Sequence, residues 1–189
     1  MDAQETHQFS QENLLPETTT MTLEEFLESG LERYEYVKGE LIPVPPTSLE
    51  HGNITTNLFL PLGLYVRQNQ LGSVYMPDTG FKVGERVLMP DIAFLANTRI
   101  PDDLSKASPV PPDLAVEVVS RTDVSRQIEE KAFAYLEAGT QLVWVIKPRS
   151  KTVTIYRSEV DITLLTRNDT LSGEKVVEGF SCQVAELFE

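Results

Sequence analysis

The segment Leu114–Ser120 constrains the fold more than any other part of the chain. Its sequence, LAVEVVS, is apolar at nearly every position, which is the pattern of a central strand buried on both faces of a sheet. A carboxylate inside such a strand is costly to bury unless it has a partner. Glu117 therefore requires either a functional explanation or an internal ion pair.

A helix and a second apolar strand are predicted to follow this strand. Asp123 can cap a helix over Val124–Ala138, which would end at Gly139. Gln141–Ile146 is again apolar and is predicted to be a strand.

Lys131 lies on the apolar side of the predicted helix. The positions that form this side follow steps of four, three and four residues: Val124, Ile128, Lys131 and Tyr135. An unpaired ammonium there would cost several kcal/mol. We expect a carboxylate or a substrate phosphate beside Lys131, the alternative being a side chain that runs along the apolar surface and exposes its charge.

The first third of the chain predicts two helices and a hairpin. The capping-box pattern Thr22–Glu25 predicts a short helix over Leu23–Ser29, and Tyr34–Val44 is predicted to be a hairpin or bent strand. Apolar residues at helical spacing predict a second helix over Ser48–Asn69, in which Pro61 should cause a kink or a break.

Short β-type segments are predicted on either side of the central strand. Before it, an antiparallel meander is expected from four segments separated by Asp, Gly and Pro: Ser73–Met76, Gly80–Val83, Val87–Met89 and Asp91–Leu95. Ala96–Asp113, with four prolines, is predicted to be a surface loop. Towards the C-terminus, edge strands are expected at Thr152–Arg157, Ile162–Thr166 and Lys175–Phe180.

The length and composition fit a single domain. Cores usually divide beyond about 250 residues, and this chain has 189. We expect residues 1–20, which are polar and acidic, to form a flexible leader, and residues 21–189 to form one domain.

Charge, cysteine content and hydropathy limit the functional classes. The net charge of -13 at pH 7 opposes binding to nucleic acid, because affinity for nucleic acid comes largely from cations that neutralise phosphates. Cys182 is the sole cysteine, so an intrachain disulfide and a cysteine-rich zinc site are excluded, and a cytoplasmic location is expected. The longest apolar run, Leu142–Ile146, is far shorter than the roughly 20 residues that span a membrane.

Asp91 and Glu117 are the candidate ligands for a metal ion. Alternation along their strands places Asp91 on the face of Ala93, and Glu117 on the face of Ala115. If the two strands are neighbours, the carboxylates converge, and one pKa would rise unless a cation lies between them. Mg²⁺ suits such a site, because it binds one or two carboxylates and keeps several waters. The main-chain carbonyl of Val118 is a further candidate ligand.

Several short motifs occur in an order that is typical of one nuclease family. The motifs are Tyr36–Glu40 (YVKGE), His51, Pro90–Ile92 (PDI), Pro112–Ser120 (PDLAVEVVS), Lys131, Tyr135, Gly139 and Trp144. With these motifs the chain resembles the Uma-two type of restriction endonucleases, within the PD-(D/E)xK nuclease superfamily, from Thr22 to Glu189. The resemblance implies an α/β fold with a restriction-endonuclease-like mixed sheet core flanked by helices, consistent with the antiparallel meander.

The resemblance also implies roles for individual residues. Asp91 and Glu117 would be metal ligands, Glu40 a further acidic residue near the metal, and Lys131 the charge-stabilising lysine. In the superfamily this lysine usually stands two residues after the acid, where this chain has Val119. We therefore infer that a lysine from the following helix takes its place. His51 is included as a further candidate catalytic residue.

The expected function is hydrolysis of DNA phosphodiester bonds by a homodimer that uses Mg²⁺, with Mn²⁺ as a substitute. Two alternatives remain open: a nuclease fold that has lost catalysis and binds DNA or protein, and a metal-dependent hydrolase of a small phosphate ester. The candidate residues also have structural interpretations. Asp91 and Glu40 could serve turns, His51 could lie at a surface or cap a helix, and Tyr135 and Trp144 could belong to the core.

Overall fold

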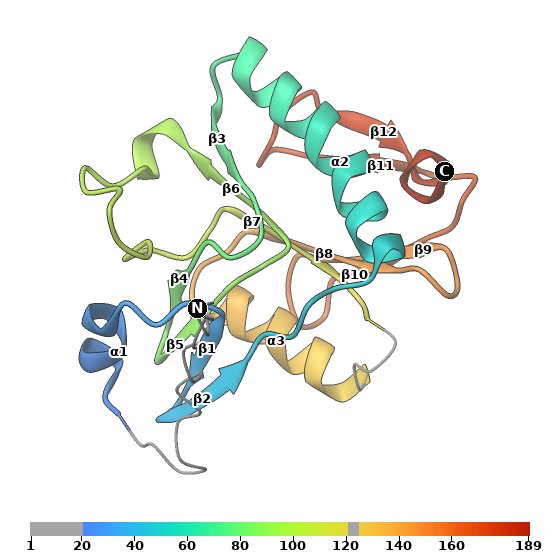
Figure 1. The fold of residues 1–189 in the computed structure, drawn as a ribbon. Coiled ribbons are helices and arrows are strands. Elements are labelled where there is room, and N and C mark those ends of the chain that lie inside the picture. The colour runs from blue at the N-terminus through green and yellow to red at the C-terminus, as the bar shows by residue number, and fades with distance from the viewer. Residues whose placement is uncertain (1–20, 121–124) are drawn as a thin grey trace, which may run out of the picture.

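A six-stranded mixed sheet forms the centre of the molecule (Figure 1). The computed structural model describes residues 21–120 and 125–189. The order of the strands in the sheet is β10-β9-β8-β7-β6-β3. Their bounds are β3 Gly72–Tyr75, β6 Ile92–Ala96, β7 Leu114–Val118, β8 Leu142–Lys147, β9 Thr152–Tyr156 and β10 Ile162–Leu165.

The predicted central strand is β7, and it lies in the middle of the sheet. It pairs in parallel with β8 and antiparallel with β6. Helix α3, Ser125–Glu137, connects β7 to β8 and is followed by Gly139, whose φ is 106°. The predicted cap Asp123 and the predicted first helical residue Val124 lie outside the described residues, as does the whole predicted leader 1–20.

Helices α2 and α3 cover opposite faces of the sheet, as Figure 1 shows. Helix α2, Leu49–Gln68, packs its buried residues against Val116 and Val118 of β7. On the other face, α3 packs against Ala115 and its neighbours. Because side chains alternate along a strand, Glu117 lies on the face covered by α3. The predicted α/β class, a mixed sheet core flanked by helices, is confirmed.

Helix α2 continues through Pro61 as one helix, so of the two predicted effects of this proline, a kink or a break, the break does not occur. Residues at four-residue steps fix the helix to the sheet: Ile54, Leu58, Leu62 and Val66 are all buried. Packing along this whole side offsets the hydrogen bond that a proline removes from a helix.

A second, four-stranded antiparallel sheet lies beside the first, in the order β2-β1-β5-β4. Its strands are β1 Tyr34–Val37, β2 Glu40–Pro43, β4 Phe81–Val83 and β5 Arg86–Leu88. The capped helix α1, Leu23–Ser29, is confirmed with its capping box, and it packs against Tyr36 and Val87 of this sheet.

The four segments predicted to form one meander divide between the two sheets. β3 pairs directly with β6, whereas β4 and β5 form a hairpin that extends the β1–β2 hairpin through β5. The physical reason is burial: Phe81, Val83 and Leu88 are at most 2% exposed and pack with the cluster that contains α3. If β4 and β5 instead continued the six-stranded sheet beside β3, these three side chains would be exposed to solvent.

The C-terminal region differs from the prediction at two segments, and it also contains two strands that were not predicted. The expected edge strand Thr152–Arg157 is β9, which lies inside the sheet between β8 and β10. Residues 174–179 form turns where the strand Lys175–Phe180 was predicted, and Val177 and Phe180 are buried in the core beside α2. The strands of this region are β11 Thr170–Ser172 and β12 Ser181–Gln183, followed by the short helix η2, Val184–Phe188. No helix within the described residues is long and apolar enough to cross a membrane.

The predicted surface loop between β6 and β7 begins with the short helix η1, Asn97–Arg99, and is held at its end by Asp113. The Asp113 side chain is 2% exposed and accepts hydrogen bonds from the Ala96 amide, Arg99 and Gln141. A buried carboxylate with this many donors is satisfied, so Asp113 is a structural residue that joins the loop to the start of β8.

Candidate active site

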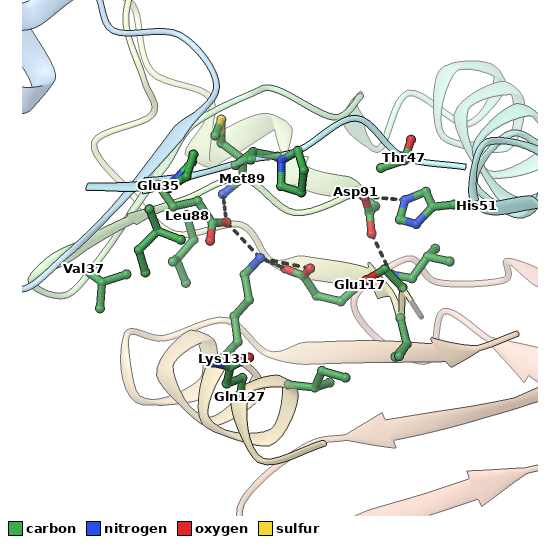
Figure 2. A pocket seen from close by; sticks show the side chains of 18 of the residues that line it. Glu35, Val37, Thr47, His51, Leu88, Met89, Asp91, Glu117, Gln127 and Lys131 are labelled. Carbon is green, nitrogen blue, oxygen red and sulfur yellow. Dashed lines mark hydrogen bonds and ion pairs between the residues drawn. The ribbon is translucent and has the colours of Figure 1, made fainter. Parts of the chain in front are cut away.

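A cavity of about 610 Å³ opens where the two sheets approach α3. Its walls come from β1, β2 and residues 43–48, from β5, from the end of β7 and from α3. Five charged or titratable side chains line this cavity in two groups, as Figure 2 shows: Lys131 contacts Glu35 and Glu117, and His51 contacts Asp91.

Asp91 directly precedes β6, and β6 pairs with β7. The register pairs Ile92 with Val116, and one step further places Asp91 beside Glu117. The condition on which convergence of the two carboxylates depended, that their strands are neighbours, is therefore met. Asp91 Oδ2 accepts the amide of Val118 at 2.7 Å, and Oδ1 lies 2.8 Å from His51 Nε2. These two contacts fix the orientation of the carboxylate.

His51 lies on the first turn of α2 and is 7% exposed. Because the carboxylate oxygen of Asp91 is an acceptor, the proton of their hydrogen bond is carried by Nε2. The sequence alternatives for His51 were a surface or capping position. The structure instead places it in the cavity as a contact of Asp91 (Figure 2).

Glu117 points into the cavity from the middle of the sheet. Its Oε1 accepts a hydrogen bond from the Tyr135 hydroxyl at 2.9 Å, and Lys131 Nζ lies 2.9 Å from Oε1 and 3.0 Å from Oε2. Burial raises the pKa of Glu117 to about 7; Lys131 opposes the rise, and the carboxylates of Asp91 and Glu35 add to it. The carboxyl thus gains or loses its proton close to neutral pH.

Lys131 reaches the cavity from α3, and the predicted carboxylate partner is present. Its Nζ lies 2.8 Å from Glu35 Oε1, in addition to its contacts with Glu117. Burial alone would lower the pKa of Lys131, but the two carboxylates outweigh burial and raise it. Lys131 is therefore a fixed cation at neutral pH.

Glu35 and Tyr135 were not identified as site residues from the sequence. Glu35 lies on β1 and also accepts the amide of Met89 at 2.8 Å. Tyr135 is fully buried, as expected of a core residue, yet its hydroxyl donates to Glu117. The signal for Tyr135 was present, because it stands four residues after Lys131 on the same side of α3. Glu35 carried no comparable local signal.

Glu40 is not brought to the cavity. It is exposed at the start of β2, where it pairs with Val37 next to the turn, whereas Ile42 pairs with Glu35. The hairpin register thus places Glu40 two positions beyond the charged cluster. The acidic residue that this hairpin contributes to the cavity is Glu35.

The carboxylate oxygens of Asp91 and Glu117 are suitable ligands for a hard cation. A carboxylate has about four lone-pair sites, and the contacts of each side chain leave at least one of them unused. Among the residues that the structure describes, no group of three His, Cys, Asp or Glu side chains could hold an ion. A cation here would rely on two carboxylates, on main-chain oxygen such as that of Val118, and on water, which is the coordination typical of Mg²⁺.

Comparisons with known proteins agree with the resemblance of the motifs. A family model named Uma2 and described as putative restriction endonuclease matches residues 20–185. An uncharacterized protein of Synechocystis sp. is 30% identical over 110 residues, which are 54% of this chain and 60% of the length of that relative.

A crystal structure of a putative nuclease of Anabaena variabilis, belonging to DUF820, is similar in fold. Its TM-score is 0.78 at 21% sequence identity, over 89% of this chain and 97% of that chain. At this identity the likeness concerns the fold.

Proposed function

The chain belongs to the Uma2 family of putative restriction endonucleases, and on this premise we propose that it is a metal-dependent endonuclease that hydrolyses DNA phosphodiester bonds. One observation carries the proposal. Asp91 and Glu117, from paired strands, line one cavity together with the fixed cation Lys131. Two acids and a lysine on a nuclease fold are the groups that such a reaction requires.

Asp91, Glu117 and the main-chain carbonyl of Val118 are the groups that would hold Mg²⁺, or Mn²⁺ in its place. Such an ion, when bound, lowers the pKa of water and neutralises phosphate charge. Other residues of the chain fix the orientation of the two carboxylate ligands. The Val118 amide and His51 orient Asp91, while Tyr135 and Lys131 orient Glu117.

Lys131 would contact the substrate phosphate in addition to its contact with Glu117. An ammonium has three donors, and a donor that leaves Glu117 can turn to a phosphate oxygen. The ammonium would then stabilise the negative charge that develops on the phosphate. In this role Lys131 replaces the strand lysine that is absent at Val119.

The test is metal-dependent nicking of supercoiled plasmid by the full chain. We expect nicking in Mg²⁺ or Mn²⁺, and a fall of about a hundredfold or more in Glu117→Gln, because the substitution removes the charge that retains the ion. Glu137→Gln is the matched control, since Glu137 is an exposed glutamate on α3 that does not line the cavity. Equal nicking by wild type and Glu117→Gln would contradict the proposal.

The concave, acidic cavity favours a second candidate, a metal-dependent hydrolase of a small phosphate ester. A cavity of about 610 Å³ is within the usual range for small-molecule sites, and the net charge of -13 would repel a long polyanion. Turnover of bis(p-nitrophenyl) phosphate without plasmid nicking would favour this candidate.

The third candidate is a binding module that has lost catalysis. It would be favoured if the chain bound DNA but neither bound the metal nor turned over either substrate. In such a module, the contacts of Glu117 with Lys131 and Tyr135 would serve stability alone.

We further propose a homodimer, since two symmetric sites are the simplest way to cut two strands. Sedimentation equilibrium of the full chain tests this, and a single monomeric species with and without DNA would contradict it. The cytoplasmic location remains a prediction from the cysteine content.

A further inference from the structure

Lys131 is shared between two carboxylates that belong to different sheets. Glu117 projects from β7 of the six-stranded sheet, and Glu35 projects from β1 of the four-stranded sheet. Lys131 Nζ contacts one oxygen of Glu35 and both oxygens of Glu117 at 2.8 to 3.0 Å. These contacts can use all three ammonium donors.

A cation bound to Glu117 would change this balance. The cation and the ammonium carry like charges, and both would draw on the same two oxygens, so each weakens the hold of the other. If Glu117 were the sole carboxylate beside Lys131, the ammonium would compete with the ion at full strength. Glu35 is a second carboxylate to which the ammonium can remain bound when a cation binds Glu117.

Glu35 itself is well fixed. Its Oε1 accepts the amide of Met89 at 2.8 Å, and its strand pairs with β2 on one side and β5 on the other. The side chain is 13% exposed. A carboxylate with this support can retain an ammonium without moving.

We propose that Glu35 is a positioning residue, which holds Lys131 at the cavity and lowers its competition with a cation for Glu117. This inference rests on the proposed function, because it takes Glu117 as a metal ligand. Glu35 acts through Lys131 and not through contact with the ion or the substrate. The prediction that follows is that the effect of Glu35 on metal binding depends on the presence of Lys131.

The experiment is a double-mutant cycle read by Mn²⁺ binding, measured by calorimetry on the full chain. We expect Glu35→Gln to weaken Mn²⁺ binding by about tenfold, because the ammonium of Lys131 then competes with the ion for Glu117 at full strength. In a Lys131→Met background the same substitution should weaken binding by less than about threefold, because the competing ammonium is gone. Equal weakening in both backgrounds would overturn the proposal.

A conservative variant and a control complete the test. Glu35→Asp keeps the charge and should stay within about threefold of wild type, whereas an effect as large as that of Glu35→Gln would overturn the proposal. Glu85→Gln, exposed on the turn between β4 and β5, controls for a general loss of acidic charge. The thermal midpoint of each variant shows whether it is folded.

The outcomes distinguish the two proposals. If Mn²⁺ binding is lost in Glu117→Gln but unchanged in Glu35→Gln, the role of Glu35 is overturned and the metal site stands. If Mn²⁺ binding is unchanged in Glu117→Gln, both are overturned. The kinetic constants give a further test of the positioning role. Glu35→Gln should lower kcat more than it raises KM for plasmid, because the substitution displaces Lys131 and leaves the rest of the chain unchanged.

Discussion

At the scale of single residues, burial and charge oppose each other at Glu117. Burial raises its pKa and the ammonium of Lys131 lowers it, and the balance is a pKa of about 7. Because the folded value lies above the ordinary 4.5, the contribution of Glu117 to stability is present at acid pH and is lost as the pH rises towards 7. A bound cation would remove this loss, since it favours the ionised carboxylate.

This balance predicts that metal binding depends on pH. We expect Mn²⁺ to raise the thermal midpoint more at about pH 8 than at about pH 5.5, because a proton competes for Glu117 below its pKa of about 7. The apparent affinity should fall by about tenfold per pH unit below that value. Differential scanning fluorimetry measures the shift. A shift that is independent of pH in wild type would contradict the assignment of Glu117 as a ligand.

At the scale of elements, close packing of β3 against β6 helps to position the site. Asp91 directly precedes β6, and β6 lies between β3 and β7. Gly72, the first residue of β3, lies so close to β6 that an added Cβ would stand 2.0 Å from the carbonyl oxygen of Leu95. No real Cβ fits at that distance, so the two strands require glycine at this position.

Alanine substitutions at two glycines should therefore have opposite effects. Gly72→Ala is expected to lower the free energy of unfolding by about 2 kcal/mol or more, because β3 must move away from β6. Gly63→Ala in α2 meets no atom within 4 Å and should raise it by about 0.5 to 1 kcal/mol, since alanine favours the helix. Urea denaturation measures both, and a neutral Gly72→Ala would show that β3 does not need this close approach.

At the scale of the whole molecule, the site forms where two sheets meet. The six-stranded sheet supplies Asp91 and Glu117, the four-stranded sheet supplies Glu35, and α2 and α3 supply His51 and Lys131 (Figures 1 and 2). The net charge of -13 is unfavourable for any approach by DNA. Divalent cations at the cavity would offset part of this repulsion.

DNA binding is therefore expected to depend on divalent cations beyond their effect on ionic strength. At matched ionic strength, Ca²⁺ in place of Na⁺ should raise the affinity for a short duplex by about tenfold, because charge is neutralised at the point of contact. Fluorescence anisotropy measures the affinity. The gain should be smaller in Glu117→Gln, and an equal gain in that variant would place the effect elsewhere on the surface.

Much of the site could be predicted from local sequence patterns. The apolar strand around Glu117, the side of α3 that carries Lys131, and the face shared by Asp91 and Ala93 all follow from periodicity. His51 was included through the family motifs, but its contact with Asp91 could not be predicted, since α2 and β6 are far apart along the chain. Glu35 was missed and Glu40 was chosen in its place, because the register of β1 and β2 decides which carboxylate enters the cavity.

The sequence by itself determined the local elements: the capped helix α1, the buried strand β7, the amphipathic helix α3 and the apolar strand β8. Each depends on side-chain spacing and end signals within a few residues. Only the tertiary structure decided that β4 and β5 join the second sheet, that Val177 and Phe180 enter the core from turns, and that Glu35 meets Lys131. These features depend on pairing between segments distant in the chain, where burial of apolar area selects one arrangement among several that local patterns allow.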